Sequence, residues 1–278
     1  MDGNLKKDTD SLSMRIKHLI SRAFPYMIEP KKTLQPAALK LAFTICPQNF
    51  GRALVLAEFI NWSNATFSPE RQIRIAIVGG YKDEPEIKAL EILGFPISFQ
   101  IFGIEQDMTQ FDLNSVTNPN MKLDNNFDLV LCSQVWEHLW NHHAAFINLR
   151  GLMSNDTYLW LAMPHSNRAH GSPHFFSAGF TSQYIAENLR NLGMTVLSYG
   201  DLGTLRNYRA THMMPVWLSV KGHRYPIFFA FSTKGRLVRW LFSIKHIFQA
   251  IYLTSLSGKI TENPATSTES WCLARGIN

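Results

Sequence analysis

Residues 73–87 read IRIAIVGGYKDEPEI, a short apolar strand that runs into two glycines and then into a helix start. The strand, Ile73 to Val78, is apolar apart from Arg74, which is typical of a strand buried in a parallel sheet. Nucleotide-binding loops are built on such strand-to-helix turns. The acidic residues of Asp83-Glu84-Pro85-Glu86 would repel a phosphate, so the turn predicts a ligand that tolerates negative charge.

The chain beyond this turn alternates between strand and helix patterns. Asp83 is placed to cap the helix that follows the turn, and Glu86 is placed to complete a capping box. The alternation predicts an α/β domain around a mainly parallel sheet with helices on both faces. The later elements are expected as strands at 97–104, 127–132, 158–163 and 194–199, and as helices at 136–153 and 181–192.

Both flanks differ from this central pattern. Residues 1–70 carry apolar positions at helical spacing, broken by prolines, and predict a helical N-terminal cap. The main α/β domain is expected at 71–233, with PIFFAFS at 226–232 as its last strand. Residues 234–278 are expected as an amphipathic helix at 236–252 followed by a flexible tail. That helix suits either peripheral contact with a membrane or docking on the domain's own core.

Composition excludes several classes of protein. With 46% hydrophobic and 17% charged residues, the chain can bury a full core. The formal charge of +6 comes from dispersed lysines and arginines, so no nucleic-acid interface is expected. The three cysteines contain no Cys-x-x-Cys pair and predict neither a disulfide framework nor a zinc site. The polar N-terminus lacks the apolar stretch of a signal peptide, and we expect a cytoplasmic protein.

The residues directly after each strand are the candidates for ligand binding, because ligands of open parallel sheets lie beyond the carboxyl ends of the strands. Gly79, Gly80 and Tyr81 follow the first strand, and Glu105 follows the second. Glycines let a ligand approach the backbone, and an acidic residue at the second strand end can accept both hydroxyls of a ribose. A tight turn and a solvated strand end would produce the same residues without a ligand.

The segment FDLVLCSQVWEHL at 127–139 resembles the fourth-strand segment of class I S-adenosylmethionine-dependent methyltransferases. The resemblance extends over about residues 70–200 and implies a Rossmann-like methyltransferase fold with S-adenosylmethionine as the cofactor. This cofactor carries a sulfonium and an ammonium in place of a phosphate, which suits an acidic turn. The resemblance implies that the methionine part is bordered by Gly79, Gly80 and Tyr81, the ribose held by Glu105, the adenine lined by Asp112 and Leu113, and the ligand flanked by Ser133 and Gln134.

The chain also departs from that family. The family's first motif has an acidic residue two places before the first glycine and glycines at every second position, where this chain has Ile77, Tyr81 and Asp83. The stretch from Glu105 to Phe127 leaves little room for the helix that the family has between its second and third strands. Two alternatives therefore stay open: a nicotinamide-dependent oxidoreductase, and a catalytically inactive methyltransferase-like module that binds a partner or a membrane.

The stretch MPHSNRAHGSPHFFSAGFT at 163–181 lies where the family has its acceptor-binding loop. It is similar to a histidine- and glycine-rich loop of methyltransferases that act on sugars, lipids or other small hydroxylated acceptors. This similarity implies methylation of an oxygen, with a nitrogen as the alternative, in a small-molecule, lipid or glycan-like acceptor. A histidine can take the proton of the acceptor hydroxyl. The candidates are His165, His170 and His174; His170 is preferred because a Gly-Ser-Pro turn follows it.

A second group of histidines raises the question of a metal. If 136–153 is one helix, His138 and His142 are four residues apart and share a face, as metal ligands would. Metal-dependent relatives in the same superfamily carry an acidic residue where this chain has Gln134. We therefore expect no metal.

Overall fold

The computed structural model describes residues 35–46, 50–116, 126–166, 174–203, 217–220, 223–226 and 267–276. The predicted helix at 236–252 and the predicted strand residues 227–232 lie outside these ranges. The described elements, in chain order, are α2 (Pro36–Ile45), α3 (Phe50–Thr66), β1 (Ile73–Val78), α4 (Pro85–Ile92), β2 (Ile97–Gly103), β3 (Thr109–Gln110), β4 (Leu129–Ser133), the 3-10 helix η2 (Trp136–His138), α5 (His142–Gly151), β5 (Tyr158–Pro164), α6 (Ser182–Asn191), β6 (Thr195–Leu202), β7 (Trp217–Val220), β8 (His223–Pro226) and β9 (Glu269–Arg275).

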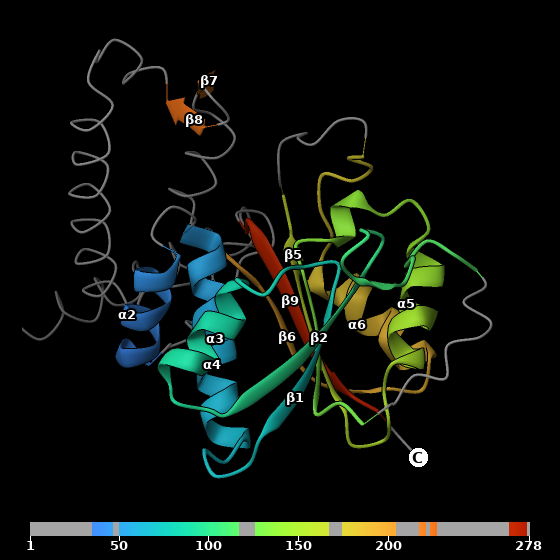
Figure 1. The fold of residues 1–278 in the computed structure, drawn as a ribbon. Coiled ribbons are helices and arrows are strands. Elements are labelled where there is room, and N and C mark those ends of the chain that lie inside the picture. Colours follow the sequence, from blue (N-terminus) through green and yellow to red (C-terminus); the bar gives the residue numbers. More distant parts are fainter. Residues whose placement is uncertain are drawn as a thin grey trace, which may run out of the picture.

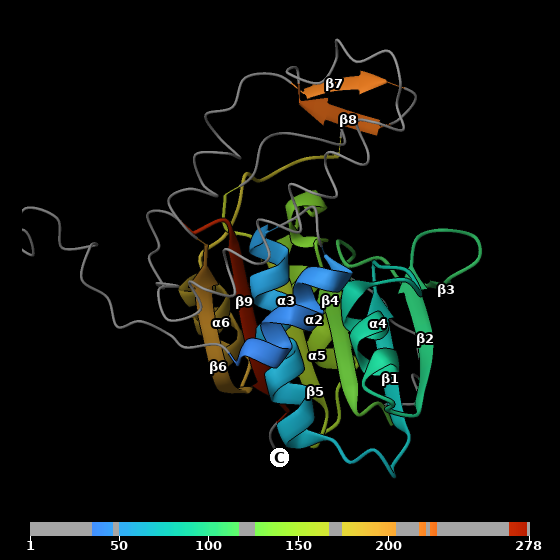
Figure 2. The ribbon, with the colours of Figure 1, turned by 90° about the vertical axis from the view of Figure 1, so that its left-hand side faces the viewer.

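A seven-stranded sheet lies at the centre of the described chain (Figure 1), and its strand order is β3-β2-β1-β4-β5-β9-β6 (Figure 2). The pairs β1–β2, β1–β4, β2–β3 and β4–β5 are parallel. Only β9 runs against its neighbours, and it pairs antiparallel with both β5 and β6. The predicted fold class, a mainly parallel methyltransferase-like α/β sheet, is confirmed. Strands β7 and β8 form a separate antiparallel pair.

Burial explains why the central strands have such apolar sequences. Every residue of β4 is buried, and β1 exposes only Arg74. Helices cover both faces of these strands, so their side chains cannot alternate between core and solvent. In β6, by contrast, the first half alternates between exposed and half-buried side chains, as expected for a strand at the margin of the sheet.

The helices form one layer on each face of the sheet (Figure 1). Helices α2, α3 and α4 bury one hydrophobic cluster against the sheet, including Ile75, Leu131 and Trp160. Helices α5 and α6 bury a second cluster on the opposite face, including Val130 and Leu161. Helices α2 and α3 fall within the region predicted as a helical cap. Within the described residues, no helix has both the length and the apolar character that a membrane-spanning helix requires.

Strand β9 comes from a part of the chain that the sequence does not predict as a strand. The sequence predicts a flexible tail for Glu269–Arg275, yet these residues form a strand inside the sheet, between β5 and β6. The run Trp271-Cys272-Leu273-Ala274 is buried. Because β9 has neighbours on both edges and helices on both faces, its central residues 271–274 are all apolar and buried, and they show no alternation that would mark it as a strand.

Two local predictions about helices are also wrong. The expected helix at 136–153 is divided into η2 and α5, because Asn141 caps α5 by accepting a hydrogen bond from the amide of Ala144. In α4, the N-cap residue is Glu84, and its side chain makes no capping bond. Asp83 instead lies at the surface within 3.8 Å of Lys88, and Glu86 is buried. Proline at the first helical position starts α4 without a capping box.

Stacked aromatic rings join the α3 layer to the sheet. The ring of Trp160 in β5 stacks on Trp271 of β9 with centroids 5.1 Å apart, and on Trp62 of α3 at 5.9 Å. Phe59 meets Trp160 edge-on at 5.1 Å. These contacts connect β5, β9 and α3 through one fully buried side chain.

We predict that Trp160→Ala lowers the free energy of unfolding by about 3–5 kcal/mol, because it removes a buried indole and leaves a cavity between two layers. Trp140→Ala is the matched control, since Trp140 is 64% exposed, and it should change stability by about 0.5 kcal/mol or less. Denaturant unfolding of both variants measures the difference. Equal losses in the two variants would contradict the packing role of Trp160.

Candidate functional site

Polar residues converge on the edge of the sheet where β2, β1, β4 and β5 end. Strand order reverses between β1 and β4, since β1 lies next to β2 on one side and next to β4 on the other. Open α/β sheets bind ligands at such a switch point, outside the carboxyl ends of the strands. Because β9 is antiparallel, its first residues lie at the same edge, with Glu269 opposite Pro164. This edge is the candidate site.

The turn after β1 brings backbone close to the neighbouring segments. Gly79 has φ +71°, a conformation that side chains disfavour. A Cβ atom at Gly79 would lie 2.8 Å from the methyl groups of Val135, and one at Gly80 would lie 2.8 Å from Glu84 Oε1. Gly79 therefore needs to be glycine for both conformation and space, whereas a side chain at Gly80 would have to displace the carboxylate of Glu84.

Glu105 lies just past the end of β2, and its carboxylate is exposed to solvent. The Tyr81 hydroxyl donates a 2.6 Å hydrogen bond to Glu105 Oε1, which links the ends of β1 and β2. This bond raises the pKa of Tyr81. The side chain of Gln110 also donates to the Glu105 carbonyl at 2.6 Å. The structure thus brings Glu105, the residue predicted to hold the ribose, next to the predicted glycine turn.

A buried ionic cluster lies behind the turn. Arg52 of α3 contacts Glu84 at 2.7 Å and Glu86 at 3.2 Å. Burial alone would lower the pKa of Arg52, but the charges of Glu86, Glu84 and Glu269 raise it above its usual value. Burial and the neighbouring Glu86 raise the pKa of Glu84, although Arg52 opposes them. The described cluster thus combines one guanidinium with three carboxylates.

The last residue of β4, Ser133, and the next residue, Gln134, contact carboxylates of this cluster. Ser133 is buried and donates a 2.8 Å hydrogen bond to Glu86 Oε1. Gln134 has φ 57°, the one positive value among the described non-glycine residues. Its side-chain amide donates to Glu269 Oε2 at 2.8 Å. A non-glycine residue in this conformation costs on the order of 1 kcal/mol or more and is found preferentially at functional sites.

The predicted adenine-lining pair lies farther along the same side. Leu113 is buried in the core cluster shared with α5 and α6. Asp112 is exposed, and its backbone carbonyl accepts a hydrogen bond from Asn148 of α5. The nearby Asn114 side chain accepts hydrogen bonds from the backbone amides of Trp140 and Asn141. These contacts tie the loop after β3 to the start of α5.

The three candidate histidines differ in their surroundings. His165 follows β5 and is held by described residues: its Nδ1 lies 3.3 Å from Asp201 Oδ1 and 3.1 Å from Ser270 Oγ. His174 is exposed, and the structure shows a hydrogen bond to its backbone carbonyl from His138 Nδ1 at 2.6 Å. The preferred candidate, His170, lies outside the described residues.

Two histidines of the range 136–153, His138 and His142, contact backbone carbonyls. His138 bonds the His174 carbonyl, and His142 Nε2 lies 3.2 Å from the Trp136 carbonyl. Burial lowers the pKa of His142. Within the part of the chain that the structure describes, no group of His, Cys, Asp and Glu side chains is arranged to hold a metal ion.

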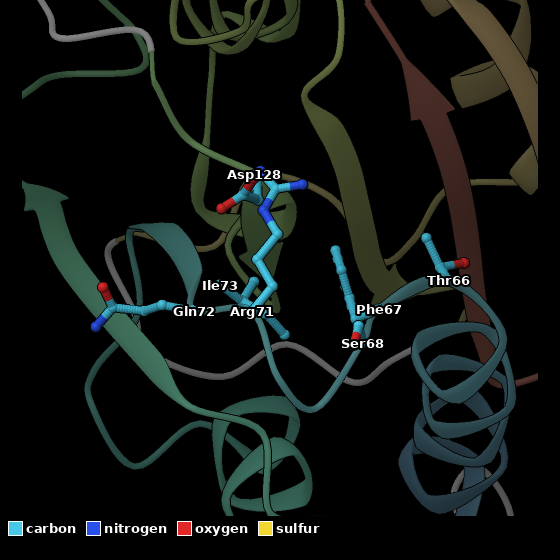
Figure 3. A pocket seen from close by; sticks show the side chains of 7 residues that line it. All are labelled: Thr66, Phe67, Ser68, Arg71, Gln72, Ile73 and Asp128. Atoms are coloured by element: carbon cyan, nitrogen blue, oxygen red, sulfur yellow. Dashed lines mark hydrogen bonds and ion pairs between the residues drawn. The ribbon is translucent and has the colours of Figure 1, made fainter.

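A small cavity of about 150 Å³ lies at the opposite edge of the sheet (Figure 3). It is next to Ile73, where β1 begins, and to Asp128, which precedes β4. Arg71 pairs with Asp128 there at 2.5 Å. This edge carries the amino ends of the parallel strands, so the cavity is separate from the candidate site.

Sequence reasoning missed five residues of the candidate edge. Arg52 lies in a helix far from the glycine turn in sequence, and its apolar neighbours gave no signal. Asp201 follows the alternating part of β6 and could have been found as an acidic strand end. The sequence pattern around Glu84 indicates only a helix start. Glu269 and Ser270 were hidden in the expected tail.

The ionic cluster generates a testable prediction. Arg52→Met should lower the free energy of unfolding by about 3–5 kcal/mol near neutral pH, because it leaves buried carboxylates without their partner. The raised pKa of Glu84 means that its folded state binds a proton more tightly than its unfolded state. Protonation therefore favours folding, and the variant should regain stability as the pH falls toward mildly acidic values.

Arg71→Met is the matched control, since Arg71 pairs with Asp128 at the surface with 77% of its side chain exposed. That variant should lose about 1 kcal/mol or less. Urea unfolding at neutral and at mildly acidic pH measures both. An Arg52 variant that loses further stability on acidification would contradict the assignment.

Comparisons with known proteins give fold neighbours only. No family model matches the chain, and no curated protein matches it in sequence. Among solved structures, it is similar to the [4+2]-cyclase SpnF, with 13% identity, a TM-score of 0.45 and coverage of 89% of this chain and 98% of that one. It is also similar to phosphoethanolamine N-methyltransferase 2 of Haemonchus contortus in complex with S-adenosyl-L-methionine, with 10% identity, a TM-score of 0.43 and coverage of 88% and 58%.

A third neighbour is coclaurine N-methyltransferase bound to N-methylheliamine and SAH, with 10% identity, a TM-score of 0.41 and coverage of 81% and 71%. Similarities at this level transfer no residue roles to this chain. The order and directions of the chain's own strands are those of a class I methyltransferase-like fold.

Proposed function

We propose that this protein is an S-adenosylmethionine-dependent methyltransferase that methylates an oxygen of a small hydroxylated acceptor. The observation that carries the proposal is the edge at the β1–β4 switch point. There, the glycine turn after β1, the exposed carboxylate after β2 and the strained Gln134 after β4 lie on adjacent strands. Three independent features of a ligand site at one switch point are more than a tight turn alone requires.

Charge distinguishes the proposed ligand from a nicotinamide dinucleotide. The carboxylate of Glu84 lies against Gly80, where a pyrophosphate would have to approach the backbone. With Glu86 and Glu269 nearby, the described cluster has more carboxylates than guanidinium groups. Such surroundings repel a dianion and favour a cation. A sulfonium and an ammonium fit this edge; a pyrophosphate does not.

The residues present fit the cofactor in distinct ways. Glu105 offers a solvent-facing carboxylate for the two ribose hydroxyls, with Tyr81 holding one of its oxygens. Gly79 and Gly80 leave the backbone of the turn without side chains. When bound, S-adenosylmethionine supplies a methyl group that is already activated by its sulfonium. The protein's main contribution is then to orient the acceptor oxygen toward that carbon and to exclude water.

The nature of the acceptor is inferred from the loop after β5. A small-molecule, lipid or glycan-like hydroxyl compound suits the histidine-rich sequence at 163–181, and a histidine there takes the proton of the hydroxyl. Peripheral contact of residues 236–252 with a membrane stays a prediction. Flotation with anionic liposomes tests it, since attachment that high salt reverses is expected and a requirement for detergent would contradict it.

Calorimetric titration with S-adenosylhomocysteine and, separately, with NADH tests the proposed ligand. We expect binding of the first and none of the second. Binding of NADH would favour the oxidoreductase alternative. Failure of both ligands to bind a folded protein would favour the inactive methyltransferase-like module.

Glu105→Ala should weaken S-adenosylhomocysteine binding by roughly 2–4 kcal/mol, because two charge-assisted hydrogen bonds to the ribose are lost. This corresponds to a dissociation constant about 30-fold to 1000-fold higher. Glu91→Ala, which removes an exposed carboxylate from α4, is the control and should bind as the wild type does. An alanine variant at Glu105 that stays folded and keeps the wild-type affinity would contradict the role of this strand end.

A further inference from the structure

A histidine, a serine and an aspartate from three different strands meet at the edge beside the proposed cofactor site. His165 directly follows β5, Ser270 lies near the start of β9, and Asp201 lies near the end of β6. Ser270 and Asp201 are directly opposite each other in the β6–β9 pairing. The backbone amide of His165 donates to the Thr268 carbonyl at 3.0 Å, so the histidine continues the β5–β9 pairing by one residue.

We propose that Asp201 and Ser270 position His165 as the general base of the methyl transfer, an inference that rests on the proposed function. His165 Nδ1 lies 3.3 Å from Asp201 Oδ1 and 3.1 Å from Ser270 Oγ. Ser270 Oγ in turn lies 2.5 Å from Asp201 Oδ1. The carboxylate and the hydroxyl thus act on the same ring nitrogen.

The aspartate is kept ionised in a nearly buried place. Burial alone would raise the pKa of Asp201, but the hydrogen bonds from His165, Ser270 and the Ser182 amide together lower it below its usual value. The Ser182 amide donates to Asp201 Oδ1 at 2.8 Å, and it lies at the first residue of α6, where the helix dipole also favours an anion.

An ionised Asp201 decides which nitrogen of the ring carries the proton. A lone pair on Nδ1 facing a carboxylate oxygen would be repulsive, so the proton resides on Nδ1. The second nitrogen, Nε2, then keeps its lone pair. Among the described residues, no hydrogen-bond partner of Nε2 is found. The same division of roles between a histidine and a buried aspartate operates in hydrolase triads.

The position of His165 places this base next to the cofactor edge. Gln134 follows the neighbouring strand β4, and its backbone amide donates to the Ala162 carbonyl of β5 at 2.7 Å. Its side chain bonds Glu269, which is adjacent to Ser270 in β9. The proposed cofactor residues on β2, β1 and β4 and the proposed base on β5 thus form one continuous row.

The proposed step balances with the methyl donor as the only co-reactant. A bond forms between the acceptor oxygen and the methyl carbon while the carbon–sulfur bond breaks and its electron pair stays on sulfur. The acceptor's hydroxyl proton passes to Nε2 of His165. The products are the methyl ether, neutral S-adenosylhomocysteine and an imidazolium that Asp201 stabilises.

Nitrogen NMR of labelled histidine tests the positioning role without a known acceptor. At mildly alkaline pH, the wild-type signal that disappears in His165→Gln should show a proton on Nδ1 and a bare Nε2. In Asp201→Asn this preference should be lost and the two tautomers should mix. Asp156→Asn is the matched control, since the Asp156 side chain is 87% exposed, and it should leave the His165 signal unchanged.

A purely structural Asp201 would give a different result. Asp201→Asn would then lower the melting temperature through α6 but leave the His165 tautomer as in the wild type, and this outcome overturns the proposal. A wild-type proton on Nε2 also overturns it. Failure of S-adenosylhomocysteine to bind the wild type would refute the proposed function, while the tautomer measurement still decides the geometry on its own.

Screening hydroxylated acceptors with labelled S-adenosylmethionine supplies the kinetic readout. His165→Gln and Asp201→Asn should each lower kcat by about 100-fold to 10,000-fold while S-adenosylhomocysteine affinity stays at the wild-type value. Asp156→Asn should keep the wild-type kcat. A His165 variant with undiminished kcat would show that another group, or none, takes the proton.

Discussion

The ion pairs of Arg52 hold together the parts of the molecule on which the candidate site depends. Arg52 lies in α3 and pairs with two carboxylates at the start of α4, Glu84 and Glu86. Glu86 in turn accepts a hydrogen bond from Ser133 at the end of β4. One guanidinium therefore fixes a helix layer, the glycine turn and a strand end relative to one another. A buried cation is tolerated only because several carboxylates surround it. These carboxylates outnumber the guanidinium, so this edge of the sheet carries net negative charge.

Two groups of residues lie side by side along the edge of the sheet where the parallel strands end. The ends of β2, β1 and β4 provide an exposed carboxylate, a turn that begins with two glycines, and a strained glutamine, and our proposal assigns ligand binding to these three features. The ends of β5 and β6 and the start of β9 provide a histidine held by a hydroxyl and a buried carboxylate, and our proposal assigns proton transfer to this group. The parallel arrangement brings both sets to the same edge, because all parallel strands end there.

Strand β9 has a structural and a chemical role at once. Its insertion between β5 and β6 brings Trp271 into the stack with Trp160, and its first residues bring Glu269 and Ser270 to the candidate site. The antiparallel direction is what allows this, since a parallel strand in the same place would begin at the opposite edge. Folding of the sheet and completion of the site therefore depend on the same late segment of the chain.

The amino-acid sequence by itself determined the fold class and the positions of the main strand ends. The apolar runs at 73–78, 127–132 and 158–163 predict buried parallel strands, and the topology of such a sheet identifies Gly79, Glu105 and Gln134 as edge residues before any coordinates are known. These predictions succeed because they depend on local patterns. The fold-level resemblance carried by residues 127–139 agrees with the observed strand order.

Only the tertiary structure decided which side chains act together. The acidic residues at 83–86 have the same sequence signature whether they cap a helix or surround an arginine, and Arg52 lies too far away in sequence to distinguish the two. His165, Asp201 and Ser270 come from three separate segments, and Ser270 lies in a strand whose sequence, ESWCLAR, shows no alternation of polar and apolar residues. Contacts between distant segments depend on strand order and direction, and no local periodicity encodes those.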